Sequence, residues 1–117
     1  MENNLYNYKG TVTNVVDGDT VDVLIDVGFH LSFKTRVRLL GINTPEMNAK
    51  DEATRTAAQA AKNFTTAHLL NSQVKLHTEK ADAFGRYLAI IYLTKDGVEV
   101  NFNDLLLQSG YAIAFKG

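Results

Sequence analysis

Two adjacent runs rich in β-branched residues, 8–16 and 20–27, constrain the fold of this chain more than any other feature. Branched side chains favour extended backbone because they pack well on a pleated surface. The two runs contain Val12, Val15, Val16, Val21, Val23, Ile25 and Val27. Between the runs stands Asp17-Gly18, a strong signal for a tight turn that joins antiparallel strands. The sequence therefore predicts a β-hairpin near its start.

More extended runs follow at 29–41, 73–79 and 86–94. Within the first of these, Arg36 and Arg38 share one face, because successive side chains of a strand alternate. Val37 and Leu39 then take the opposite face. Lys-Asp-Gly at 95–97 predicts a turn, with a short extended piece after it.

Two helices are predicted where apolar residues recur at three- and four-residue spacing. The first covers about 51–70, and its recurring residues are Ala53, Ala57, Ala60, Ala61, Phe64 and Ala67. We expect the second to begin at Asn103 as its N-cap, with Phe102 packed against Leu107, and to end at Gly110. Five strands with a helix between the third and fourth predict an α+β, mainly β fold. This is a five-stranded Greek-key barrel of the OB type with two to three helices, although periodicity alone leaves other α+β arrangements open.

Composition limits the chemistry that is available. The chain has 117 residues without an internal linker or repeat, so we expect residues 1–117 to form a single domain. It contains no cysteine, which excludes disulfides, thiolate zinc sites and cysteine nucleophiles. No export signal and no membrane-length apolar stretch are visible in it. The net charge is -1, so a protein of this kind that handles nucleic acid needs a bound cation and a few placed arginines.

Asp17 and Asp19 are the first candidate site residues. They are two positions apart, so in extended backbone both point to one side. Taken alone, the Asp17-Gly18 segment is already explained by a plain hairpin turn, since Asp-Gly is common in turns. Asp19 lies beyond the turn, where a strand-forming residue is expected, and its carboxylate suits a hard cation such as Ca²⁺ or Mg²⁺.

The segment that ends the third extended run is a second candidate. It offers the side-chain oxygen of Asn43, the backbone carbonyl of Thr44, and Glu46 as a general base for a cation-associated water. A solvated polar loop before a helix is the alternative. Arg86, after Gly85, is a third candidate, because a guanidinium matches the oxygens of a phosphate; an ion pair to Asp82 is its alternative.

These residues together supply what phosphodiester cleavage requires. Asp19 and Asn43 would hold a cation, Glu46 would activate water, and Arg38 with Arg86 would bind the phosphate. That set needs no globally basic surface, which answers the objection raised by the net charge.

The segments that carry these residues resemble those of a known family. VVDGDTVDV, RVRLLGINTPE and DAFGRYLAIIY are similar to the signature segments of the staphylococcal nuclease (thermonuclease) family, in the same order and at similar spacings, and NDLLLQSGYA near the end also matches. The resemblance covers roughly residues 9–114. It implies an OB-fold barrel and a Ca²⁺-dependent endonuclease that acts on DNA and RNA and leaves 3′-phosphate ends.

The resemblance also implies roles by position. The acidic metal ligand is Asp19, the backbone-carbonyl ligand Thr44, the general base Glu46, the phosphate-binding pair Arg38 and Arg86, and the supporting acid Asp17.

Two departures from the family pattern matter. The second metal-binding position, usually aspartate, is Asn43 here, which keeps an oxygen but removes a negative charge, so we expect weaker metal binding and an opening for Mg²⁺ or another divalent cation. Ala83 occupies a position at which the family usually has a lysine. Phe84 replaces a tyrosine in the substrate-binding segment, and its ring keeps the capacity to stack on a base.

Three functions remain open on sequence alone. The leading hypothesis is a monomeric nuclease domain with DNA and RNA as substrates. A catalytically weakened nucleic-acid-binding module of the same fold is the main alternative, and a protein-interaction OB domain is the third. Retention of Asp19, Glu46 and both arginines favours the nuclease.

Overall fold

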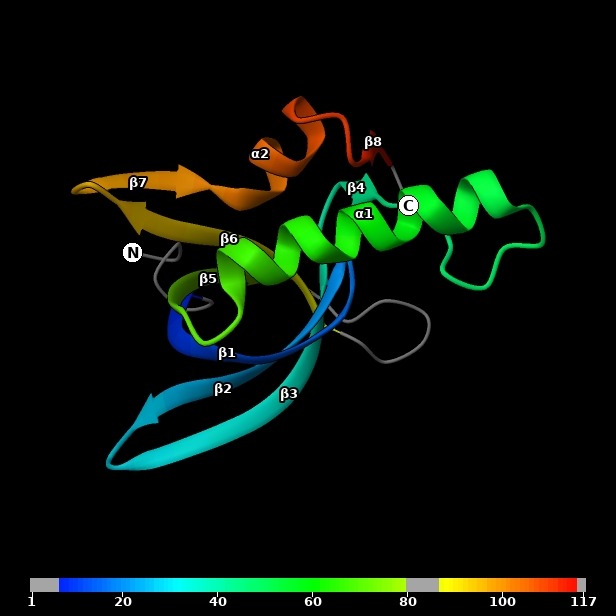
Figure 1. Ribbon diagram of the computed structural model, residues 1–117. Coiled ribbons are helices and arrows are strands. Elements are labelled where there is room, and N and C mark those ends of the chain that lie inside the picture. The colour runs from blue at the N-terminus through cyan, green and yellow to red at the C-terminus, as the bar shows by residue number, and fades with distance from the viewer. Residues whose placement is uncertain (1–6, 80–86, 116–117) are drawn as a thin grey trace.

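Strands dominate the computed structural model, which describes residues 7–79 and 87–115. In chain order, its elements are β1 (Asn7–Asp17), β2 (Thr20–Gly28), β3 (Leu31–Leu39), β4 (Ile42–Asn43), α1 (Glu52–Leu69), β5 (Gln73–Glu79), β6 (Tyr87–Lys95), β7 (Val98–Asn101), α2 (Phe102–Gln108) and β8 (Ile113–Ala114) (Figure 1). Of the described helices, none is long and apolar enough to cross a membrane.

The sheet closes into a barrel. Its strand order is β3-β2-β1-β5-β6-β7 with antiparallel neighbours, and a parallel pairing of Val37–Leu39 in β3 with Tyr87–Ala89 in β6 closes the ring, with β7 attached outside it to β6. Five strands therefore form the barrel, and α1 connects β3 and β4 to β5, as the OB prediction requires. The interior contains the completely buried side chains of Val12, Val21, Val23, Val37, Leu39, Ala89 and Ile91. The predicted α+β fold is confirmed.

The turn at Gly18 lies directly under helix α1. A Cβ at Gly18 would come within 2.8 Å of the Ala61 Cβ, so only glycine fits at this approach. The Thr65 hydroxyl donates a hydrogen bond of 2.8 Å to the Gly18 carbonyl. Helix and turn are thereby locked together, which fixes the position of the acidic residues on both sides of Gly18.

Helix α1 begins as predicted but buries a different face. Asp51 is its N-cap and accepts from the Thr54 N–H at 2.8 Å. The buried residues are Ala58, Ala61, Thr65 and Leu69, of which only Ala61 belongs to the predicted apolar series. Ala53, Ala57, Ala60 and Ala67 are exposed. Alanine is a good helix former on any face, so its spacing did not reveal which side meets the barrel.

Helix α2 begins two residues earlier than predicted. Asn101, not Asn103, is the N-cap, and its side chain accepts from the Asp104 N–H at 3.0 Å. Phe102 is the first helical residue and is completely buried in the core. It therefore does not lie before the N-cap, the position that the predicted staple with Leu107 requires. Gly110 follows the helix with φ 85, as expected for the residue that ends it.

Asn103 instead connects α2 to the barrel through side-chain hydrogen bonds. Its side chain is buried and donates to the Leu40 carbonyl at 2.9 Å and to the Ala89 carbonyl at 3.1 Å. Its oxygen accepts from the Ile91 N–H at 3.2 Å. One amide thus satisfies backbone groups of β6 and of the turn after β3.

Replacing these two asparagines tests the assignment. We expect Asn103→Ala to lower the free energy of unfolding by about 3 kcal/mol, because it leaves buried backbone groups without partners. Asn101→Ala should cost about 1 kcal/mol, the usual effect of losing an N-cap. Urea unfolding monitored by circular dichroism measures both, and a larger loss for Asn101→Ala would contradict the assignment.

Candidate functional site

Asp19 is the buried centre of the polar cluster between β2, β3 and β4. Its Oδ2 accepts from the Thr44 N–H at 3.0 Å and from Arg38 Nη2 at 3.3 Å, and its Oδ1 accepts from the Thr20 hydroxyl at 3.2 Å. Burial disfavours the charged form. Hydrogen bonding with Asp17 and Thr44 and the positive charge of Arg38 outweigh it and hold the pKa of Asp19 below its usual value. Asp19 is therefore ionised at neutral pH.

Arg38 is held on several sides. Its Nη1 donates to the carbonyls of Leu39 at 3.2 Å and Ile42 at 3.1 Å, while Nη2 donates to Asp19 and also to Asn43 Oδ1 at 2.6 Å. The side chain is only 13% exposed. Neighbouring Arg36, by contrast, lies on the surface and pairs with Asp22. Strand alternation alone does not separate the two arginines, which both belong to the predicted polar face.

The Phe115 ring completes the surroundings of Arg38, with its centroid 5.5 Å from the guanidinium carbon. It is placed there by the short β4–β8 pairing, in which Ile42 lies opposite Ala114 and Asn43 opposite Ile113. The Phe115 N–H also donates to the Gly41 carbonyl at 2.9 Å. Sequence reasoning missed this residue, because nothing local links position 115 to position 38.

Asp17 contributes an oxygen without a protein partner. Its Oδ1 is buried and makes no hydrogen bond within the described part of the chain. Burial, together with a hydrogen bond to Asp19 and the negative charge of that residue, raises the pKa of Asp17 to about 6. Two carboxyl groups at one buried place, one of them with an orphaned oxygen, form an arrangement that a cation would stabilise.

The predicted ligand set fits a hard cation in its chemistry, since it consists of oxygen donors only. Within residues 7–79 and 87–115 there is no cluster of three or more acidic or histidine side chains. Asn43 directs its oxygen to Arg38. The carboxyl groups of Asp17 and Asp19 are thus the acidic groups of this cluster, and the oxygen of Asn43 is engaged by Arg38.

Glu46, Arg86 and Phe84 are the predicted site residues that the described structure does not connect to Asp19. Glu46 lies in the loop after β4 with an exposed side chain that makes no hydrogen bond or ion pair to another described residue. Its backbone carbonyl accepts from the Ala49 N–H at 3.3 Å. Arg86 and Phe84 lie outside the described residues.

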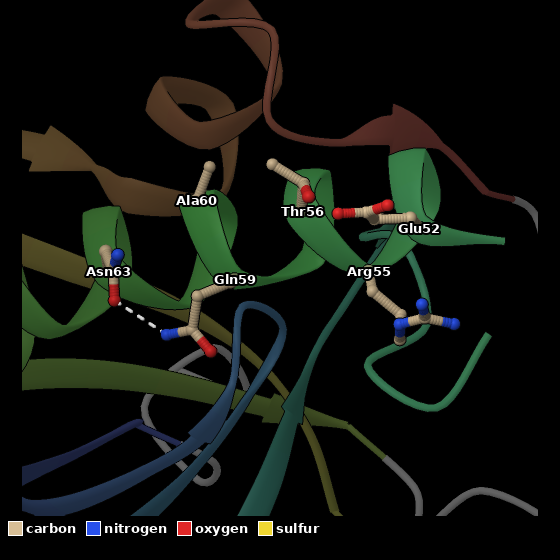
Figure 2. Close-up of a pocket in the computed structure, with 6 residues that line it drawn as sticks. All are labelled: Glu52, Arg55, Thr56, Gln59, Ala60 and Asn63. Atoms are coloured by element: carbon tan, nitrogen blue, oxygen red, sulfur yellow. Dashed lines mark hydrogen bonds between the residues drawn. The ribbon is translucent and has the colours of Figure 1, made fainter. Parts of the chain in front are cut away.

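A shallow depression on α1 is a separate feature. Its lining consists of Glu52, Arg55, Thr56, Gln59, Ala60 and Asn63, as Figure 2 shows. Gln59 donates to Asn63 along the helix, and Arg55 donates to the carbonyls of Ala49 and Lys50. Its arginine is therefore committed to the backbone, and none of the six residues belongs to the Asp19 cluster.

Comparison with known proteins bears on this cluster. The sequence pattern of the family described as staphylococcal nuclease homologue matches residues 36–116. Thermonuclease of Staphylococcus intermedius is 38% identical over 88% of the chain, and that of Staphylococcus hyicus is 34% identical over 95%. An uncharacterised protein of Methanocaldococcus jannaschii is 32% identical over 91%. The matches cover 58%, 57% and 60% of these relatives from M. jannaschii, S. intermedius and S. hyicus, so the chain spans less than two thirds of their length.

Replacing Asp17 by asparagine tests the electrostatics. A carboxyl whose pKa is raised in the fold destabilises the protein at pH values above that pKa, and the penalty disappears below the unfolded value. For Asp17 these limits are about 6 and 3.8. Without divalent cations, Asp17→Asn should gain about 1 kcal/mol at pH 8, allowing for the half-exposed side chain, or about 4 °C in Tm, and almost nothing at pH 3.5. Asp96→Asn on an exposed turn is the control, and an equal gain of Asp17→Asn at both pH values would contradict the prediction.

Proposed function

Since this chain belongs to the family of staphylococcal nuclease homologues, we propose that it is a nuclease that hydrolyses phosphodiester bonds in DNA and RNA. The observation that carries the proposal is the buried pair of Asp19 and Arg38, 3.3 Å apart, beside the orphaned Oδ1 of Asp17. A buried charge pair costs free energy in an otherwise apolar barrel, so its presence supports a chemical role.

The proposed reaction depends on a divalent cation, with Ca²⁺ the first choice and Mg²⁺ the alternative. Asp19, with Asp17 in support, would hold it, joined by the Thr44 carbonyl and Asn43. A bound cation supplies a Lewis acid for the phosphoryl oxygen and lowers the pKa of a water. The choice of Ca²⁺ and the expectation of 3′-phosphate ends come only from the resemblance of the sequence motifs to the thermonuclease family.

Arg38 binds the phosphate in this proposal. Asp19 and Asn43 occupy its Nη2, so an incoming phosphate oxygen competes with Asn43 for the same donor. The charged acceptor makes the stronger hydrogen bond. Arg38 then turns from Asn43 to the phosphate and releases the Asn43 oxygen as a ligand. Arg86 is proposed as the second phosphate-binding residue from its place in the motif alone.

Glu46 is the proposed general base. Its exposed position in the loop after β4 leaves the carboxylate free of protein partners within the described residues, so it is available to take a proton from water. Stacking of a base on Phe84 completes the proposal from the motif alone.

One observation favours the alternative of a weakened, nucleic-acid-binding domain. Asn43 is neutral, so a cation here meets one negative charge fewer than it would with an aspartate at this position. The Asn43 oxygen also accepts a hydrogen bond of 2.6 Å from Arg38, which a cation must displace. Both effects lower the affinity for a cation. The same fold would then bind nucleic acid with little cleavage.

A cleavage assay separates the two. Single-stranded DNA and RNA are incubated with Ca²⁺, with and without chelator, and with Glu46→Gln. We expect chelator-sensitive cleavage and a loss of about 10²–10³ in rate in the variant without a change in Tm, because the Glu46 side chain makes no hydrogen bond or ion pair to any other described residue. Glu99→Gln on β7 is the matched control and should cleave normally.

Arg38→Lys belongs in the same assay, with Arg36→Lys as its control on the same strand. We expect the cleavage rate to fall about 10²-fold for Arg38→Lys only, since lysine keeps the charge but cannot donate two parallel hydrogen bonds as a planar guanidinium does. Binding without cleavage by the wild type would establish the alternative, and cleavage that resists chelator would contradict the cation.

Calorimetry tests the role of Asn43. Asn43→Asp should tighten Ca²⁺ binding by about tenfold, because it restores a negative charge beside Asp19. Asn63→Asp, the same change on the outer face of α1, should leave the affinity unaltered. Equal affinities in Asn43→Asp and wild type would remove Asn43 from the cation site.

A further inference from the structure

The β2–β3 hairpin extends beyond the rest of the barrel (Figure 1) and carries exposed apolar side chains. Its exposed side chains are Val27 at 46%, Phe29 at 93%, Leu31 at 61% and Phe33 at 52%. Phe33 lies opposite Ile25, whose side chain is buried, so the exposed residues continue the inner face of the barrel into solvent. We define Val27, Phe29, Leu31 and Phe33 as the hairpin patch. Clusters of this kind on a soluble domain mark interaction sites.

The tip of the hairpin adds a second observation. Phe29 has φ 55 and His30 φ 61, in the left-handed region that residues with a Cβ seldom adopt. Glycine or asparagine would suit this turn better. The sequence instead places Phe29 there, the most exposed large apolar side chain among residues 7–79 and 87–115, at a cost in folding free energy that a contact made by Phe29 would offset.

The edge of β3 is the third observation. Residues 31–36 pair with β2 on one side, while β6 pairs only with Val37, Arg38 and Leu39. In the described part of the chain no other strand covers residues 31–36. Their outward backbone groups are therefore open to another strand, and an open apolar edge is a template for pairing.

We propose that a second copy of this chain pairs along this edge, with the two β3 strands antiparallel and Phe33 on the twofold axis. Residues opposite each other then share a face. Phe33 meets Phe33 of the second copy, and Leu31 lies opposite Thr35. The aromatic pair forms the centre, and the same patch serves both copies, as a closed dimer requires.

Charge selects this register. With Phe33 on the axis, Lys34 lies opposite Ser32 of the second copy, and Ser32 neighbours Asp26 on β2. The ammonium group of Lys34 can therefore reach over Ser32 towards that carboxylate. Moving the axis one residue towards the barrel, to Lys34, places Lys34 opposite Lys34, and moving it two residues, to Thr35, places Lys34 opposite Arg36; both of these registers bring like charges together.

The area predicts a weak dimer. At these exposed fractions the hairpin patch offers about 450 Å² per copy, given side chains of about 150–250 Å² each. With the two strand edges the dimer buries about 1,000–1,200 Å², at the lower limit for specific association. The pairing is centred on Phe33, five residues or about 17 Å along β3 from Arg38, and it involves no residue of the Asp19 cluster, so it does not rest on the proposed function. It departs from the monomer expected from sequence.

Sedimentation velocity of the full chain at rising concentration tests the proposal. We expect the average mass to rise from 12.9 kDa towards twice that value between about 10 µM and 1 mM. Phe33→Glu puts two carboxylates on the axis and should weaken association at least tenfold. Val98→Glu, the same kind of change at the exposed end of the β6–β7 hairpin, is the control and should dimerise like wild type. Mass that stays at the monomer value throughout would overturn the proposal.

Cross-linking tests the register, and the absence of cysteine from the chain removes any background. Phe33→Cys should form a disulfide between copies under mild oxidation, because position 33 faces itself. Thr35→Cys should not, since the two copies of position 35 lie about 13 Å apart in this register, beyond the reach of a disulfide. Cross-linking of Thr35→Cys in preference to Phe33→Cys would overturn the register.

Binding assays distinguish the dimer from two other ligands of the hairpin patch, a lipid surface and a nucleic acid. Phosphatidylcholine–phosphatidylglycerol vesicles and a thymidine oligonucleotide are each added to wild type and to Phe33→Glu at concentrations where the chain is a monomer. Retention of the wild type alone on vesicles, or on the oligonucleotide, without self-association at higher concentration would assign the patch to that ligand and overturn the dimer. If wild type and Phe33→Glu bind vesicles and oligonucleotide equally, and the wild type self-associates at higher concentration, the dimer is supported.

Discussion

The buried carboxylate of Asp19 is the interaction on which the rest of the site depends. Thr20 supplies it with a hydroxyl, Arg38 with a guanidinium, and Thr44 with a backbone N–H. These partners come from β2, from β3 and from the chain just after β4. A single ionised group thus holds together segments that are far apart in sequence, and its desolvation is offset only while all of them remain in place.

Arg38 shows how a nearly neutral protein concentrates positive charge. The chain has a net charge of -1, so it has no general attraction for phosphate. A guanidinium fixed against the carbonyls of Leu39 and Ile42 is preorganised, and preorganised charge needs little rearrangement when an anion arrives. The other terminal nitrogen of this guanidinium engages the oxygen of Asn43 at 2.6 Å.

Strands β2 and β3 contribute to two different surfaces, one at each end of the hairpin that they form. Where Thr20 lies opposite Arg38, β2 and β3 enter the barrel and support the polar cluster. Where Gly28 lies opposite Leu31, they leave the barrel and their inward-facing side chains have no core to fill. Strand alternation continues past the point at which the barrel ends, and this continuation produces the exposed hairpin patch.

The sequence by itself determined the elements whose signals are local: the hairpin turn at Asp17-Gly18, the start of a helix at about Asp51, the strand alternation around Arg38 and hence the barrel class. Tertiary structure alone decided which face of α1 is buried, because alanine spacing is compatible with either side. It also decided that Asn103 bridges to the barrel instead of capping α2, and that Asn43 contacts Arg38. Each of these contacts joins segments brought together only by barrel closure, and no local pattern encodes the partner of a side chain whose hydrogen bonds are satisfied at long range.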